Sequence, residues 1–262
     1  MADTVFLAGT GAEDGAWAPV IQAIHDTDPN ARFCQTPDHA NFYMAKFIAV
    51  VRAACAVIGR TGQQFLPPIL ATRRELEANI SARLSEAFTK GTLRLGSHFR
   101  EVVSNSEWGE SKVFVTTNWD KLIEGAFPGT TVRHVHGAIN TPSASLFLPS
   151  DYAFDASHSS EAGRNMLFAQ DACIHELWNA RTVVIYGLGL DPIDGELAAI
   201  CETGFKKDTH RPPIARIVIY NLEEKRLQIL DRVNLLLAGA ECPNTAVEFR
   251  VCPKSSVNHE TP

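Results

Sequence analysis

The sequence lacks several features that would point to a membrane, to secretion or to nucleic acid. No apolar run approaches the roughly 18 residues that a membrane span requires. The first segment lacks the basic start and long apolar stretch of a signal peptide, so a cytoplasmic protein is expected. The 24 basic residues form no dense block and are outnumbered by 30 acidic ones, for a net charge of -6. Direct binding to nucleic acid or to a membrane is therefore not expected.

Cysteine is present, but not in any pattern that binds metal. The six cysteines include no C-x-x-C pair and no cluster with histidine at the spacing of a zinc site. The plain interpretation is a set of buried free thiols in a reducing cytosol. Internal repeats and low-complexity tracts are also absent.

What the sequence does have is a series of short segments rich in valine, isoleucine, phenylalanine and tyrosine. Four of them are continuously apolar, the pattern of strands covered on both faces of a parallel sheet: 4–9, 112–117, 182–187 and 216–221. The segments 131–137 and 247–252 alternate, which favours strands nearer an edge. Amphipathic helical segments fill the gaps. This alternation predicts an α/β fold with a doubly wound, mostly parallel, Rossmann-like sheet.

The helical content is uneven along the 262 residues. Between residues 40 and 106, three amphipathic segments follow one another with no convincing strand among them. We therefore expect a Rossmann-like domain in two parts, 1–39 and 107–254, with a helical insertion at 40–106 between them. The polar tail, 255–262, is expected to be flexible.

Polar residues crowd the junction between the strand at 112–117 and the helix that follows. Thr116, Thr117, Asn118 and Asp120 all lie within five residues of one another. Asp120 is a good helix cap, and Thr117 could assist it. A buried amide such as Asn118 would still need hydrogen-bond partners, and a ligand that carries a carboxamide would supply them.

The first predicted strand runs into a turn that contains Gly9, Gly11 and Gly15. Glycines here would let the backbone approach a pyrophosphate at the start of the next helix. The spacing departs from the usual dinucleotide fingerprint, and any tight strand-to-helix turn can use glycine. Both interpretations remain open from the sequence.

A histidine pair follows in the segment "VRHVHG". His134 and His136 lie on the same side of the predicted strand, and Gly137 comes directly after them. An alternating pair of this kind can be ordinary edge patterning. Gly137 favours a site, because it suggests that the backbone beside His136 passes close to something bulky.

Two later strand ends have simple structural explanations. Gly187 and Gly189 precede a helix whose start, with Pro192 and Asp194, has ordinary helix-initiating chemistry. Asn221 follows the strand at 216–221, where a capping asparagine is an adequate explanation.

Taken in chain order, these segments resemble the SIR2 (sirtuin-like) family. That family has a Gly-rich first turn, a T-N-x-D motif, an H-G motif, a Gly-containing turn and an asparagine after a late strand. The counterparts here are "GTG" at 9–11, "TTNWD" at 116–120, "HG" at 136–137, "GLGLD" at 187–191 and "YNLE" at 220–223. Ala12 and Glu13 stand where the family often has a serine.

The four-cysteine zinc module of sirtuin deacylases is absent from the sequence, which limits the resemblance to one branch of the family. The chain is similar to the zinc-free SIR2-like branch, whose members hydrolyse NAD+ in bacterial anti-phage defence, often alongside partner proteins. This implies an NAD+ glycohydrolase that cleaves the nicotinamide–ribose bond and needs no metal. It also implies an NAD-binding role for the Rossmann-like domain, a homo-oligomer and a possible defence partner. The amphipathic stripes of 40–106 make this segment a candidate assembly surface, although such stripes more often pack on their own domain. The alternative is a non-catalytic regulatory module that binds NAD+ or ADP-ribose.

The resemblance also implies roles for particular residues. Asn118 and Asp120 would lie near the nicotinamide and its ribose, with Asn118 placed to orient a water. His136 would accept a proton from that water or from a ribose hydroxyl. The expected NAD-binding residues are Gly9, Thr10 and Gly11 for the pyrophosphate, Gly187 and Gly189 beside the dinucleotide, Asn221 facing the adenosine ribose, and Thr117 and Gly137.

Overall fold

The structure, a computed structural model, describes residues 3–58, 66–139, 146, 148, 161–191, 194–206 and 214–253. Six strands form one parallel sheet in the order β5-β4-β1-β6-β7-β8. Their bounds are β1 Thr4–Ala8, β4 Lys112–Thr116, β5 Thr131–His134, β6 Thr182–Tyr186, β7 Arg216–Asn221 and β8 Ala246–Val251. All six predicted strands are confirmed, and the two alternating segments, β5 and β8, form the two edges of the sheet.

The strand order is that of a doubly wound Rossmann-like sheet, as predicted. The chain begins in the middle with β1, moves outward through β4 and β5, and then returns to place β6 on the other side of β1. The direction of winding therefore reverses between β1 and β6. In open α/β sheets, ligands bind outside the carboxyl ends of the strands at such a reversal point.

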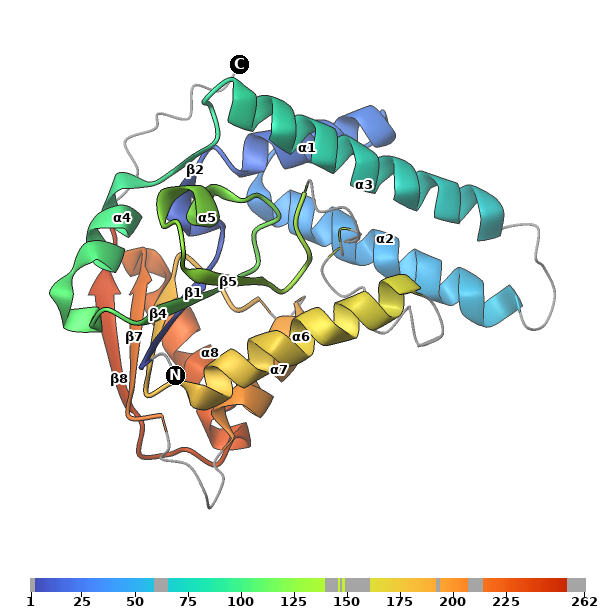
Figure 1. Cartoon of the computed structure of the whole chain (residues 1–262). Coiled ribbons are helices and arrows are strands. Elements are labelled where there is room, and N and C mark those ends of the chain that lie inside the picture. The colour runs from blue at the N-terminus through green and yellow to red at the C-terminus, as the bar shows by residue number, and fades with distance from the viewer. Residues whose placement is uncertain are drawn as a thin grey trace.

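Helices cover both faces of the sheet (Figure 1). The helices are α1 Trp17–Thr27, α2 Pro37–Ile58, α3 Leu66–Thr89, α4 Ser97–Ser104, α5 Leu122–Ala126, α6 Glu161–Asn179, α7 Gly195–Phe205 and α8 Arg226–Gly239. Single 3-10 turns occur at η1 Thr10–Ala12, η2 Ser106–Trp108 and η3 Glu223–Lys225. The long helices α2 and α3 extend well beyond the sheet.

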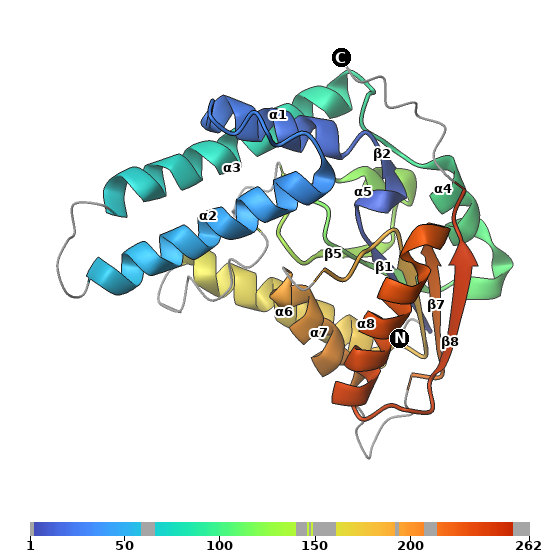
Figure 2. The same cartoon turned by 180° about the vertical axis from the view of Figure 1, so that it is seen from behind.

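Two hydrophobic cores lie on opposite faces of the sheet. In β1, Phe6 and Ala8 pack into the core shared with α1 to α4, whereas Val5 and Leu7 pack into the core shared with α6, α7 and α8. Figure 2 shows these last three helices gathered beside the sheet, apart from α1, α2 and α3. Because side chains alternate along a strand, a strand covered on both faces must be apolar at every position.

Between residues 40 and 106 the chain forms most of α2, all of α3 and α4, and also a short strand. Residues 94 and 95 form a short strand, β3 (Arg94–Leu95), which pairs antiparallel with β2 (Glu13–Asp14). Only Leu95 of this strand is buried, so no periodic signal marks it. The expectation that 40–106 contains no strand is therefore wrong, because pairing with a distant segment decided it.

Other expectations concern a membrane span, the cysteines and the tail of the chain. No helix within the described ranges is both long and apolar enough to cross a bilayer. The five cysteines whose side chains are described form no disulfide with one another, and four of them are buried. The predicted flexible tail and Pro192 lie outside the described residues.

Candidate functional site

The polar residues singled out in the sequence gather at the carboxyl ends of four neighbouring strands. Ala8 is in register with Thr116 of β4 and with Tyr186 of β6, and Thr116 is in register with His134 of β5. The four strands therefore end level with one another. Asn118 and His136 each follow two residues after one of these paired positions, on adjacent strands.

Asn118 is the most constrained side chain of this group. It is only 4% exposed, and its main-chain N–H donates to Thr116 Oγ1 at 3.1 Å. Its Nδ2 donates to the carbonyl oxygen of Gly9 at 3.3 Å and to Glu13 Oε1. Because the Gly9 carbonyl can only accept, the amide is fixed with nitrogen toward the first turn and oxygen away from it.

The amide oxygen of Asn118 is consequently left without a partner. Oδ1 is buried and accepts no hydrogen bond from the residues that the structure describes. A buried acceptor with no donor costs about 1–3 kcal/mol, so such an atom in a folded protein calls for an explanation. A ligand or water that donates a hydrogen bond here would satisfy it.

Asp120 and Glu13 form a buried carboxyl pair beside Asn118. They are 4% and 9% exposed, and their side chains are hydrogen-bonded to each other. Asp120 Oδ1 also accepts the N–H of Leu122 at 2.9 Å, so it caps the start of α5 as the simpler interpretation predicted. Burial, and then the charge of Asp120 and the hydrogen bond to it, raise the pKa of Glu13 well above its usual range, although Asn118 opposes the shift.

His136 contacts the carboxylate of Asp194, which lies at the start of α7. It is 3% exposed, and its Nε2 lies 2.9 Å from Asp194 Oδ2. Asp194 Oδ1 accepts the N–H of Leu197 at 3.2 Å and caps α7. Burial alone would raise the pKa of Asp194, but the charge and hydrogen bond of His136, with the Leu197 amide, lower it below its usual value. Gly137 then turns the chain with a φ of 73°.

His134, the other histidine of the pair, has a structural role. Its Nδ1 lies 2.8 Å from the carbonyl oxygen of Asn118, and its Nε2 lies 2.9 Å from Glu124 Oε1. Burial opposes the ionisation of Glu124, but the contact with His134 lowers the pKa of that carboxyl overall. Both ring nitrogens of His134 thus serve to anchor the turn that carries Asn118.

The first turn is built differently from a pyrophosphate loop. The N–H groups of Gly9 and Gly11 donate to the carbonyl oxygens of Tyr186 and Gly187, each at 3.0 Å. Thr10 Oγ1 accepts the indole N–H of Trp17 at 3.1 Å. The two glycine donors expected to hold a pyrophosphate are therefore engaged within the protein. The structure favours the other interpretation left open by the sequence, a tight turn between packed segments.

The late strand ends also show structural contacts. Asn221 is buried, its Nδ2 donates to the carbonyl oxygen of Leu188 at 3.1 Å, and its Oδ1 accepts the N–H of Leu222 at 2.8 Å. Its side chain therefore ties β7 to the turn after β6, which is the capping role weighed in the sequence. Gly189 is exposed, and its carbonyl oxygen accepts from Arg232 of α8 at 2.6 Å. Thr117 continues the sheet ladder, since its N–H donates to the carbonyl oxygen of Ala8 at 3.1 Å.

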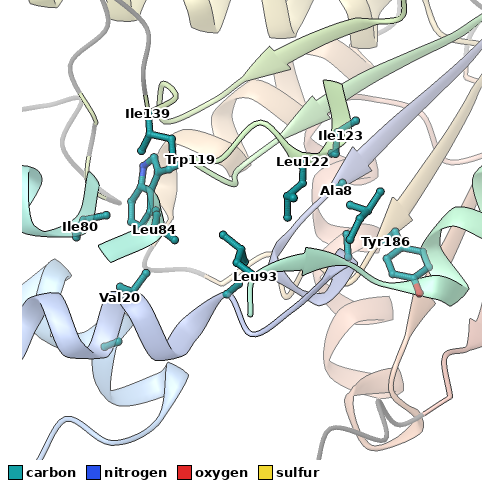
Figure 3. Close-up of a cluster of buried hydrophobic side chains, with 14 of the residues drawn as sticks. Ala8, Val20, Ile80, Leu84, Leu93, Trp119, Leu122, Ile123, Ile139 and Tyr186 are labelled. Atoms are coloured by element: carbon teal, nitrogen blue, oxygen red, sulfur yellow. The ribbon is translucent and has the colours of Figure 1, made fainter. Parts of the chain in front are cut away.

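Hydrophobic side chains that follow Asn118 in the chain hold this segment against the helical layer. Figure 3 shows Trp119 beside Ile139 and facing Ile80 and Leu84 of α3, while Leu122 lies nearer the sheet. The N–H of Ile139 donates to the carbonyl oxygen of Trp119 at 2.7 Å. Trp119 and Leu122, on either side of Asp120 in the chain, are thus buried.

The structure brings Asn118 and Asp120 together with Glu13, and it pairs His136 with Asp194. The sequence alone does not predict that Glu13 or Asp194 belongs to the site. Asp194 has the signal of a helix cap, and Glu13 is recognisable only as a departure from the family pattern. Among the described residues, no group of three or more histidine, cysteine, aspartate or glutamate side chains is arranged to hold a metal ion.

Comparisons with protein-family models, with curated proteins and with solved structures find no match to this chain. The fold class therefore rests on the topology of the sheet, and the likeness to the SIR2 family rests on the sequence motifs.

Proposed function

We propose that the protein is a SIR2-like NAD+ glycohydrolase that releases nicotinamide and ADP-ribose. The observation that carries this proposal is the unpartnered, buried Oδ1 of Asn118 at the carboxyl end of a Rossmann-like sheet. The T-N-x-D and H-G motifs supply the family resemblance. The pairing of His136 with Asp194 supports a role in proton transfer, because a buried carboxylate orients an imidazole and stabilises its protonated form.

The proposed reaction breaks the bond between C1' of the ribose and the nicotinamide nitrogen. The transition state resembles an oxocarbenium ion, and the pyridine nitrogen keeps the bonding electrons, so that nicotinamide leaves as a neutral molecule. A water oxygen then bonds to C1', and its proton passes to His136. Asn118 Oδ1 would accept a hydrogen bond from this water or from the nicotinamide carboxamide.

Asp194 lies 2.9 Å from Nε2 of His136, and we propose that this contact orients the imidazole for proton exchange. Asp120 would lie near the nicotinamide ribose. We propose no pyrophosphate contact through the N–H groups of Gly9 and Gly11, because both donate to neighbouring carbonyl oxygens.

The biological setting is proposed from the resemblance alone. Members of the zinc-free branch act in anti-phage defence, and we propose the same role here, with a homo-oligomer and a defence partner protein. On α2, within the proposed assembly segment, Phe42 and Val50 are 59% and 46% exposed.

The first prediction tests the catalytic assignment directly. Asn118→Ala and His136→Ala should each lower NAD+ cleavage by roughly 10²- to 10⁴-fold, the usual contribution of a positioned acid–base group. Purified protein is incubated with NAD+, and free nicotinamide and ADP-ribose are quantified by chromatography. Asn234→Ala and His175→Ala are matched controls, because both side chains are exposed and lie on α8 and α6.

The same assay separates the proposal from its alternative. If both site variants consume NAD+ at the wild-type rate, the catalytic assignment is wrong. If the wild-type protein binds NAD+ or ADP-ribose in calorimetry but releases no nicotinamide, the regulatory binding module is favoured instead.

A further inference from the structure

Glu13 is a buried acid whose surroundings are unusual for an ionised carboxylate. It lies in β2, directly after the first turn, and it reaches the segment that follows β4. Its side chain contacts the amide of Asn118 and the carboxyl of Asp120. In the described part of the chain no lysine or arginine forms an ion pair with it, and the neighbouring Arg94 instead lies 3.5 Å from Asp14.

Two carboxyl groups can be hydrogen-bonded to each other only if one of them carries a proton. An ionised carboxylate accepts hydrogen bonds and has none to donate. Asp120 also accepts the N–H of Leu122, and Glu13 also accepts from Asn118. Burial, followed by the charge of Asp120 and the hydrogen bond to it, raises the pKa of Glu13 well above its usual range, so we assign the proton to Glu13.

The carboxyl group of Glu13 also helps to fix the orientation of Asn118. Glu13 accepts from Asn118 Nδ2 through Oε1, so its hydroxyl is the oxygen that donates to Asp120. The Gly9 carbonyl holds the other side of the Nδ2 group. With nitrogen held by two acceptors, the amide cannot rotate without facing oxygen against oxygen.

We propose that Glu13 is a protonated positioning residue, whose hydroxyl donates to Asp120 and whose carbonyl oxygen fixes Asn118 with Oδ1 directed at the substrate. The identity of the substrate in this inference rests on the proposed function, whereas the protonation of Glu13 does not. Glu13 stands where the SIR2 family often has serine. The positioning contact made by Glu13 is therefore inferred from this chain and not from the family resemblance.

Substitutions of Glu13 separate this role from simple space filling. Glu13→Gln keeps the shape and the neutral charge, and its amide can donate to Asp120 and accept from Asn118. Glu13→Ala removes both contacts and leaves the Asn118 amide held by the Gly9 carbonyl alone, so its orientation is less strongly fixed. We expect Glu13→Gln to cleave NAD+ within about threefold of wild type and Glu13→Ala to lose about 10²-fold in kcat, as for a misplaced catalytic group.

A second measurement needs no substrate. The folded protein keeps the Glu13 proton to a higher pH than the unfolded chain, whose glutamate titrates near 4.5. The contribution of Glu13 to stability is therefore full below that value and is lost as pH rises through the folded pKa. Urea unfolding between about pH 5 and pH 9 should show wild type losing stability with pH relative to Glu13→Gln. Glu101→Gln, at an exposed site on α4, should run parallel to wild type.

Each of the two measurements can refute a different part of the proposal. A stability difference that is flat with pH would overturn the shared proton, and a well-folded Glu13→Gln variant as inactive as Glu13→Ala would overturn the positioning role. If wild type cleaves no NAD+, the proposed function fails, and the unfolding profile alone decides whether Glu13 is protonated. That profile also decides the case if Glu13→Ala does not fold.

Discussion

Asp194 makes two separate contacts with its two carboxylate oxygens. Oδ1 caps α7 through the N–H of Leu197, and Oδ2 contacts His136. One residue therefore fixes both the start of a helix and the orientation of the proposed base. The lowered pKa of Asp194 keeps it ionised at neutral pH, where its charge can stabilise a protonated His136.

Replacing Asp194 with asparagine should separate these two contacts. Asparagine is as good a helix cap as aspartate, so α7 should remain folded. The charge beside His136 is lost, and we expect kcat for NAD+ cleavage to fall by about 10²-fold or more. Circular dichroism and nicotinamide release report the two effects. Asp231→Asn, at an exposed position on α8, should alter neither, and wild-type kcat for Asp194→Asn would refute the pairing.

The turn after β1 and the turn after β6 are packed directly on each other. The N–H of Gly11 donates to the carbonyl oxygen of Gly187, and a Cβ built on Gly187 would lie 2.4 Å from Gly11 Cα. Gly187 also has a φ of 58°, in the left-handed region. These glycines are needed for contact between two elements of the sheet, at the reversal point of its winding.

Gly187→Ala should therefore destabilise the whole domain. The left-handed conformation alone costs roughly 1–3 kcal/mol for a residue with a side chain, and the collision with Gly11 adds to it. The midpoint of urea unfolding measures the loss. Gly189→Ala is the matched control two residues away, because its built Cβ meets only Arg232 Nη1, at 4.0 Å. Equal midpoints for the two variants would contradict this account of the turn.

At the β8 edge of the sheet, an ion-pair network joins the last strand to the rest of the molecule. Arg250 contacts Glu248 within β8 and Glu107 of η2, and Arg216 of β7 contacts the same two acids. The hydrogen bonds from Arg250 and Arg216 lower the pKa of Glu248 to about 2. An edge strand far along the chain is thus tied to the segment that precedes β4.

This network predicts how stability depends on acid. Because the folded pKa of Glu248 is depressed, its contribution is present above the ordinary value of 4.5 and is lost as pH falls toward about 2. Glu248→Gln should cost less than about 1 kcal/mol at neutral pH, since the pairs are partly exposed. The unfolding free energy of Glu248→Gln should also fall less steeply than that of wild type as the pH is lowered. Glu110→Gln, at an exposed site, should follow wild type, and identical acid profiles for all three proteins would exclude the effect.

The strands of the sheet can be predicted from the sequence, because burial on both faces favours an unbroken run of apolar residues. A strand such as "TVVIY" is apolar at every position, and β5 and β8 alternate because they lie at the edges. Asn118 and Asp120 stand out as candidates because the polar groups at that strand end exceed what a cap requires, and His136 stands out because Gly137 follows it. The pair β2–β3 was missed, since two short segments about 80 residues apart leave no periodic pattern.

The sequence by itself determined the α/β class, the six strands and the residues at their carboxyl ends, because each is encoded in a short run of neighbouring side chains. Only the tertiary structure decided that Glu13 meets Asp120 and that Asp194 meets His136. It also decided that the first-turn glycines pack against Gly187. Such contacts join residues far apart in the chain, and their hydrogen bonds and pKa shifts exist only once folding has removed water from between them.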